Sequence, residues 1–281
     1  MTGQSKVKLN ELDITFNCHP RRVRNILPWD EFSRLAPRTK SSREVFQLLV
    51  DCLVPLGAYN LVYAYHDEGQ LVFHSILDQS WRVLYKQCGY HNLDPGIRHV
   101  WYGGTGPTAM GREFFRFGID SLSDTTKRLL PAKTWSQSCR DFQEEVAYKT
   151  GFEIGFTIPL PPKNGMGKAG CSFGANMKGK EFDQLYNHHG GQIIGVLQTF
   201  HNCMQDALQY ERRKEFGEPN SRELAALQML ANGIERKDIE VLVSLKTRSV
   251  QQLLETARDK LGVHRNNFLA IKRAKSLGWI E

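Results

Sequence analysis

Apolar residues between residues 224 and 261 recur at three- and four-residue intervals, the period of amphipathic helices that share one small core. These positions are Leu224, Leu227, Leu230, Ile239, Val243, Val250, Leu254 and Leu261. Glycine tolerates the left-handed conformation that ends a helix, so Asn232-Gly233 predicts the end of the first helix. A short second helix is expected over 235–243, and a third over 247–261, before Gly262. A short helix, a turn and a longer helix predict a helix-turn-helix.

The outward positions of the third helix are polar, which favours duplex DNA as a partner. Arginine and glutamine can form paired hydrogen bonds with guanine and adenine edges in the major groove, and lysines can neutralise phosphates. The candidate base-reading residues are Arg248, Gln251, Gln252 and Arg258, and the candidate phosphate-binding residues are Lys237, Lys246 and Lys260. The alternative is a solvated helical face without DNA contacts.

The front of the chain alternates between helix-like and strand-like patterns. Helices are expected over 42–56, with Ser41 or Ser42 as the cap, and over 142–149. A long amphipathic helix is expected over 181–212, interrupted at Gly190-Gly191. Strands are expected over 61–65, 71–76, 156–160 and 169–175. This order predicts an α+β fold, an α-β-α sandwich with a central antiparallel sheet, followed by an all-α helix-turn-helix domain.

Changes in composition along the chain suggest domain boundaries. The stretch 214–220 contains Gly217 and Pro219 and has the composition of a linker. We therefore expect a sensor domain over 42–213 and a DNA-binding domain over 221–281. Residues 1–41 have few periodic apolar positions and are expected to form an arm that packs on the body or contacts a partner.

Composition excludes several classes of protein. With 281 residues and 41% hydrophobic content, the chain can form two domains with sizeable cores. No apolar run approaches the ~20 residues that span a bilayer, and the polar start of the sequence is not typical of a signal peptide, so we expect a cytoplasmic protein without membrane contact. The formal net charge of +7 favours nucleic acid as an acidic partner. The six cysteines form no Cys-x-x-Cys pair, and the histidine spacing does not suit a helix-face ligand pair, so we expect neither a metal site nor a disulfide framework.

The carboxyl-terminal unit resembles the LuxR-type helix-turn-helix. The resemblance is carried by residues 222–223, 229–233, 236–239, 247–250 and 260–263. It implies a transcriptional regulator whose recognition helix runs from Thr247 to Leu261. It also implies a homodimer that reads an inverted repeat of double-stranded DNA, with RNA polymerase as a candidate partner. Asp259 stands where the family often has a basic residue, and Glu255 faces the same side.

The front half resembles the autoinducer-binding domain of acyl-homoserine-lactone receptors. The matching residues are Trp81, Tyr85, Asp94 and Pro95, together with the stretch 151–159. Trp81 and Tyr85 are four residues apart and would share a helix face, and Asp94 is held extended by the proline that follows it. From the residues alone, core aromatics and a turn aspartate are the favoured interpretation, and the resemblance reverses that preference. The resemblance implies that Trp81 donates its indole N–H to the lactone carbonyl, that Asp94 accepts the amide N–H, and that Tyr85 packs on the acyl chain or bonds a carbonyl. Cys171 or Ser172 would be the small polar residue on the late strand.

Two further positions of this candidate site depart from the family pattern. Leu77 replaces a tyrosine that bonds the amide carbonyl, and Ala109 replaces a tryptophan. Trp101 or Trp135 could fill the space beside Ala109. The two changes remove one hydrogen bond and one large apolar wall, which would weaken the binding of an ordinary acyl-homoserine lactone or open space for a different molecule.

The sequence therefore predicts a DNA-binding transcriptional regulator controlled by a small molecule, an acyl-homoserine lactone or a related autoinducer in quorum sensing, without another cofactor. The alternative is a regulator with the same domain architecture that responds to another ligand or acts without a ligand. An enzyme is not expected, because no nucleophile, base and orienting group are evident. A phosphorylated response regulator would need an acidic cluster after an early parallel strand, which the amino half lacks.

Overall fold

The computed structural model describes residues 13–19, 21–67, 70–102, 108–110, 137–161, 168–242, 247–263, 266–277 and 279–281. The chain divides into two compact units, Met1–Met204 and Gln205–Glu281. The boundary lies within a single helix, α8 (Gly179–Phe216). None of the helices in the described ranges combines the length and the apolar composition needed to cross a membrane.

The first unit is built on a mixed six-stranded sheet in the order β1-β3-β2-β6-β5-β4. The strands are β1 (Asp13–Cys18), β2 (Ala58–Asp67), β3 (Gln70–Ser75), β4 (Thr108–Met110), β5 (Ile154–Leu160) and β6 (Ala169–Ala175). All neighbouring pairs are antiparallel except β1 and β3, which run parallel. The predicted central antiparallel sheet is thus confirmed, with a parallel edge strand that the sequence did not indicate.

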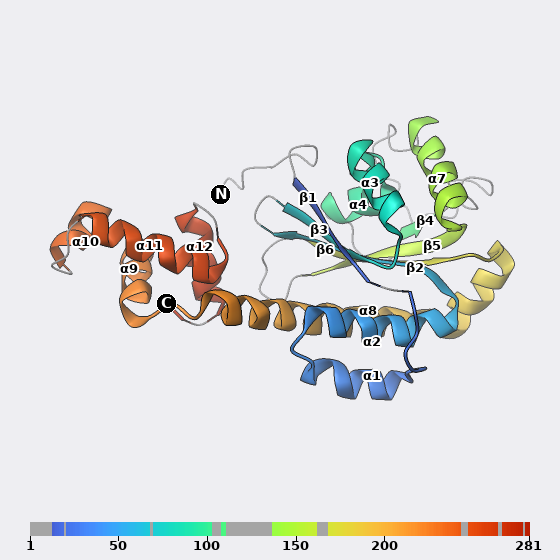
Figure 1. The fold of residues 1–281 in the computed structure, drawn as a ribbon, viewed down its shortest axis with the longest axis horizontal. Helices are drawn as coiled ribbons and strands as arrows, with labels where there is room; N and C mark the ends of the chain where they lie inside the picture. Colours follow the sequence, from blue (N-terminus) through green and yellow to red (C-terminus); the bar gives the residue numbers. More distant parts are fainter. Residues whose placement is uncertain are drawn as a thin grey trace. The chain divides into compact units, whose positions relative to one another are not determined.

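Helices cover both faces of this sheet, as predicted for an α-β-α sandwich (Figure 1). One face carries α3 (Gln79–Gln87), α4 (Pro95–Trp101) and α7 (Gln137–Thr150). The other carries α2 (Ser42–Leu53) and α8, with α1 (Trp29–Leu35) packed outside α2. Short 3-10 helices follow at Ala36–Arg38, Val54–Leu56 and Tyr90–Asn92.

The segment that precedes α2 packs on the body of the first unit. β1 joins the sheet, and the side chains of Phe32 and Ala36 are fully buried. Gln47 of α2 donates a hydrogen bond to the carbonyl oxygen of Arg22 at 3.0 Å. Of the two expectations for residues 1–41, packing on the body therefore holds for the part that the structure describes.

The long helix α8 differs from the sequence prediction, because it continues through Gly190-Gly191 without a break. Glycine weakens a helix interior by about 1 kcal/mol. Around the pair, however, Ile193, Val196 and Leu197 are buried against the sheet. A side chain at position 190 would approach the Tyr186 ring to 3.0 Å, so this glycine also makes room for an aromatic ring.

The second unit contains the predicted helix-turn-helix. Its helices are α9 (Ser221–Ala231), α10 (Arg236–Leu242), α11 (Thr247–Leu261) and α12 (Asn267–Ser276). Gly233 has a φ of 81° after α9, and Gly262 has a φ of 65° after α11, so both glycines end helices as expected. Leu227, Ile239, Val250, Leu254 and Leu261, taken from the predicted apolar set, lie in one core.

Candidate functional site

A cavity of about 60 Å³ lies between the sheet and the helices α3, α4 and α7. Its floor consists of alternate residues of the strands, because every second side chain of a strand points to the same face. Its roof is mainly aromatic and aliphatic. The floor includes Phe16, Asn60, Val62, Ala64, Leu71, Phe73, Ser75, Thr157, Gly170, Ser172 and Gly174, and the roof includes Leu77, Trp81, Tyr85, Asp94, Ile97, Val100, Trp101, Phe142, Val146 and Phe152.

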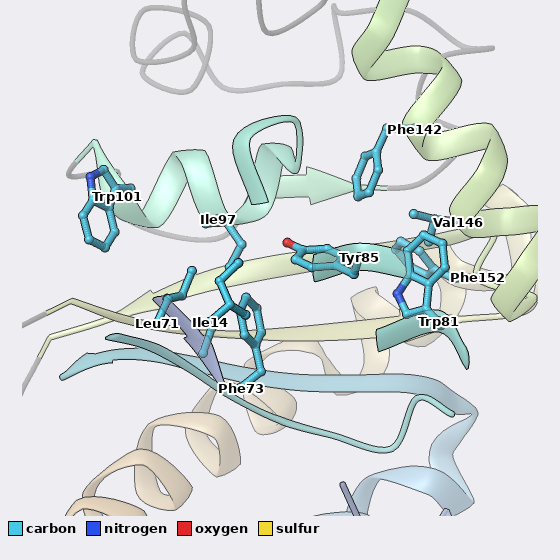
Figure 2. Packing of buried hydrophobic residues seen from close by; sticks show 11 residues of the cluster. Ile14, Leu71, Phe73, Trp81, Tyr85, Ile97, Trp101, Phe142, Val146 and Phe152 are labelled. Carbon is cyan, nitrogen blue, oxygen red and sulfur yellow. The ribbon is translucent and has the colours of Figure 1, made fainter. Parts of the chain in front are cut away.

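Trp81 and Tyr85 lie on one face of α3, as their spacing predicted (Figure 2). Asp78 caps this helix and accepts the backbone N–H of Trp81 at 2.9 Å, which fixes the first turn. The pKa of Asp78 is lowered, mainly by a hydrogen bond from the Ser80 hydroxyl. The Trp81 ring stacks on Tyr90 with centroids 5.7 Å apart, and both rings contact Phe142. The two residues are thereby held at the cavity wall by packing on several sides.

Asp94 caps α4 and hydrogen-bonds Tyr85 in the same cavity. One carboxylate oxygen accepts the N–H groups of Gly96 and Ile97 at 2.8 and 3.3 Å. The other accepts the Tyr85 hydroxyl at 3.0 Å. The backbone of Asp94 is extended, as expected before Pro95.

Burial of this pair raises the pKa of both side chains. Burial raises the pKa of Asp94, and the three hydrogen bonds that it accepts oppose this effect. The pKa of Tyr85 is raised well above its ordinary value by burial and by the neighbouring Asp94 charge. A carboxylate in such surroundings interacts strongly with any N–H donor placed against it.

On strand β6 the structure separates the two alternatives for the small polar residue. Ser172 lines the cavity and forms a hydrogen bond of 2.7 Å with the Thr157 hydroxyl of β5. Cys171 is fully buried and is absent from the cavity wall, because adjacent residues of a strand face opposite sides of the sheet. Burial also raises the pKa of the Cys171 thiol. The expectation for Cys171 as a cavity residue is therefore corrected.

The two positions that depart from the family pattern are placed differently. Leu77 lines the cavity, and its backbone N–H donates to the Ser75 hydroxyl at 2.9 Å. Ala109 lies in β4 opposite Phe156, and its side chain is outside the described part of the structure. Trp101 lines the cavity and contacts the ammonium group of Lys168 at 5.0 Å from the ring centroid. Trp135 falls outside the described residues.

Glycines on the cavity floor and Asn60 were not identified from the sequence. Gly174 allows Phe152 to pack on β6, since a Cβ there would approach the Phe152 ring to 2.5 Å. Asn60 lines the cavity from β2 and is 7% exposed. The alternation of Asn60, Val62 and Ala64 along β2 could have indicated a polar residue on an apolar face.

The candidate DNA-binding residues of the second unit fall into two groups. Gln251, Gln252 and Lys237 are exposed, with Gln251 donating to Glu255 at 2.9 Å and Lys237 paired with Glu235 at 3.0 Å. Thr247 and Arg248 begin α11, but their side chains are not described, and Lys246 lies outside the described residues.

Arg258 and Lys260 instead form contacts within the unit. Arg258 donates to Asn267 at 3.1 Å, and its guanidinium lies 3.8 Å from Glu255. The ammonium group of Lys260 lies 3.0 Å from both carboxylate oxygens of Glu223, a residue that is 3% exposed. Arg258 and Lys260 thus connect α11 to residues of the helices α12 and α9.

Comparisons with known proteins extend the likeness over most of the chain. No protein-family model and no curated protein matches the sequence. Among solved structures, Escherichia coli SdiA matches with a TM-score of 0.54 at 14% identity, covering 90% of this chain and 99% of SdiA. A structure of SdiA in complex with octanoyl-rac-glycerol matches with a TM-score of 0.52 at 14% identity, over 88% of this chain and 93% of the other. CepR2 from Burkholderia cenocepacia, described as an N-acylhomoserine lactone dependent LuxR family transcription factor, matches with a TM-score of 0.48 at 14% identity, over 64% of this chain and 95% of CepR2. The chain thus has the fold of SdiA.

Proposed function

We propose that this chain is a LuxR-type, DNA-binding transcriptional regulator whose activity is controlled by a small molecule, an acyl-homoserine lactone or a related autoinducer. The observation that carries the proposal is the apolar cavity that contains Trp81, Tyr85 and Asp94, in a chain that also has a helix-turn-helix unit. The likeness to SdiA and the residue pattern around the cavity both support it.

The polar groups of the cavity match an acylated amide. Asp94 can accept the amide N–H, and the indole N–H of Trp81 can donate to a carbonyl of the head group. The surrounding aliphatic and aromatic side chains suit an acyl chain. Ser172 extends the polar edge of the floor.

The cavity volume suggests how binding is coupled to activity. Sites for small molecules usually measure about 300–1,000 Å³, whereas this cavity measures about 60 Å³. A ligand that fills a site of the usual volume therefore requires the roof formed by α3, α4 and α7 to move away from the sheet. A ligand that binds the expanded form and not the compact form shifts the population toward the expanded form. The size of this shift is set by the difference in affinity for the two forms.

The proposed output is sequence-specific binding of duplex DNA by α11, as a homodimer at an inverted repeat. The exposed Gln251 and Gln252 are the proposed base-reading residues among those described, with Arg248 and Thr247 at the start of the helix. Lys237 and Lys246 are the proposed phosphate contacts. RNA polymerase is a proposed further partner.

A second candidate is a regulator of the same build that binds a non-lactone lipid. It is favoured by Leu77, which lines the cavity where the resembling lactone receptors have tyrosine. The SdiA structure with octanoyl-rac-glycerol supports a glycerol ester as the ligand class to test.

Thermal melting of the full chain with a panel of acyl-homoserine lactones and monoacylglycerols tests the two candidates. A ligand that binds only the folded state at a hundred times its Kd stabilises it by about 2.7 kcal/mol. In Asp94→Asn, the remaining carbonyl oxygen can still cap α4, so the fold is kept while the carboxylate that accepts the amide N–H is lost. A lactone shift in the parent that disappears in Asp94→Asn supports the first candidate, and a shift with monoacylglycerols alone supports the second.

DNA binding is tested separately with a selected duplex pool and fluorescence anisotropy. Gln252→Ala should weaken binding to the selected sequence by 1–3 kcal/mol, about 5- to 150-fold, with little effect on random duplex. Equal loss on both duplexes would contradict a base-reading role for Gln252.

A further inference from the structure

Asn60 places an unsatisfied hydrogen-bond acceptor at the cavity. Its side chain lines the floor and is 7% exposed, and its Oδ1 atom is buried without a hydrogen-bond partner in the described part of the structure. Burying a polar atom without a partner is costly, so such atoms are few in native proteins and call for an explanation. A donor supplied by a bound molecule would provide one.

The local backbone holds Asn60 at this position. Ala58 of β2 pairs with Ala175 of β6 and Asn60 pairs with Gly174, so the register shifts by one residue at Tyr59. Such bulges re-aim a side chain and recur beside functional sites. A Cβ at Gly174 would lie 3.0 Å from the Cβ of Asn60, so the glycine makes room for the asparagine.

The other polar side chains of the cavity floor, as far as the structure describes it, each take part in a hydrogen bond. Ser172 and Thr157 bond each other at 2.7 Å, Ser75 accepts the N–H of Leu77, and Tyr85 donates to Asp94. Among the described residues of the floor, Asn60 is therefore the one whose buried acceptor takes part in no hydrogen bond.

We propose that Asn60 determines ligand specificity by accepting a hydrogen bond from a hydroxyl group that the ligand carries outside the head group held by Trp81 and Asp94. This inference rests on the proposed function and narrows it to hydroxylated acyl ligands. A hydroxyl suits this site better than a keto oxygen, because it donates to Oδ1, whereas a keto oxygen can only accept. An acyl chain with a keto group, or with neither group, leaves the Oδ1 acceptor unpaired.

The test compares the full chain with Asn60→Leu, a variant of similar size that removes the polar atoms. Isothermal titration calorimetry would use octanoyl-homoserine lactone, its β-oxo and β-hydroxy forms, and monooctanoylglycerol, whose hydroxyls all lie in the head group. The parent should bind the β-hydroxy lactone about tenfold more tightly than the unsubstituted lactone, as one additional hydrogen bond implies. Asn60→Leu should lose this preference, whereas Ser172→Ala, the matched control on the same floor, should keep the ratio whatever it does to each affinity.

Melting of the ligand-free proteins provides a second, ligand-independent readout. Asn60→Leu should melt at a higher temperature than the parent, because it removes an unpaired buried acceptor. A lower melting temperature would overturn the inference, since Asn60 would then have a structural partner. Lactone binding without a hydroxyl preference would overturn the inference alone and leave the proposed function standing. Binding of monooctanoylglycerol with no lactone bound would overturn the inference and reject the lactone as signal, because all its hydroxyls lie in the head group, and failure of every hydroxylated probe to bind would also overturn the inference.

Discussion

Replacing Lys260 by methionine should destabilise the helix-turn-helix unit, although the residue was expected from sequence to contact DNA. Its ammonium group lies 3.0 Å from both carboxylate oxygens of Glu223, whose side chain is only 4% exposed. Glu223 also accepts the backbone N–H of Asn220 at 2.7 Å, within the capping box of α9. Lys260→Met keeps most of the apolar stem and leaves a buried carboxylate with that one hydrogen bond.

The expected cost follows from the burial of the pair. Breaking a buried ion pair costs about 3–5 kcal/mol, and the 20% exposure of Lys260 and the surviving hydrogen bond place this case near the lower end. The matched control is Lys237→Met, because Lys237 pairs with Glu235 at the same 3.0 Å, but their side chains are 74% and 70% exposed. An exposed pair contributes about 0–1 kcal/mol.

Hydrogen exchange of the full chain, followed by mass spectrometry, measures both variants. A loss of about 3 kcal/mol speeds exchange of the α9 and α11 amides roughly a hundredfold, whereas Lys237→Met should change it by no more than a few-fold. Adding Glu223→Gln to Lys260→Met should restore much of the protection, because the unpaired charge is removed. Equal, small effects of the two lysine variants on hydrogen exchange would refute the structural role of Lys260. A loss of DNA affinity in Lys260→Met with unchanged exchange would support Lys260 as a DNA contact.

Two further predictions concern the first unit. Burial lowers the pKa of His74 to about 3, with a further contribution from His19, whose own pKa is lowered to about 4 by burial and by Arg43. Because the neutral histidines are favoured in the fold, this stability is complete above the unfolded pKa of about 6.5 and declines as the pH falls toward 4. Urea unfolding measures the free energy of unfolding at pH 7.5 and 5.0. Its decrease between these pH values should be about 2 kcal/mol smaller in His74→Gln than in the parent. An equal decrease in the two proteins would contradict this account. Gly174→Ala should cost about 1–3 kcal/mol, because its Cβ would lie 2.5 Å from the buried Phe152 ring, and a melting temperature equal to the parent's would show that the ring can move.

Local patterns in the sequence were sufficient for the helical parts of the site. The four-residue spacing of Trp81 and Tyr85 and the Asp94-Pro95 pair predicted a shared helix face and an extended carboxylate, and the structure shows both. Strand alternation could also have chosen Ser172 over Cys171, had the cavity face of β6 been known. Contacts between residues distant in sequence were not predictable, because they depend on the order of the strands in the sheet, which local patterns do not give.

Asn60 illustrates this limit. Its missing partner becomes evident only when β2, β6 and the roof are assembled, since many asparagines in a sequence have satisfied side chains. Lys260 illustrates the converse: its position on α11 is compatible with phosphate binding, and only the approach of α9 brings Glu223 against it. In both cases, contacts between elements distant in sequence determine what the side chain does.

The parallel pairing of β1 with β3 has a consequence for shortened forms of this protein. Removing the chain up to residue 18 would convert β3 into an exposed edge with unpaired backbone groups, a template for association with other chains. The same cut would remove Phe16, which stacks on Phe73 at 4.7 Å, meets Tyr85 edge-on and lines the cavity. A truncated chain should therefore both self-associate and lose ligand selectivity, so any comparison of ligands requires the amino-terminal strand.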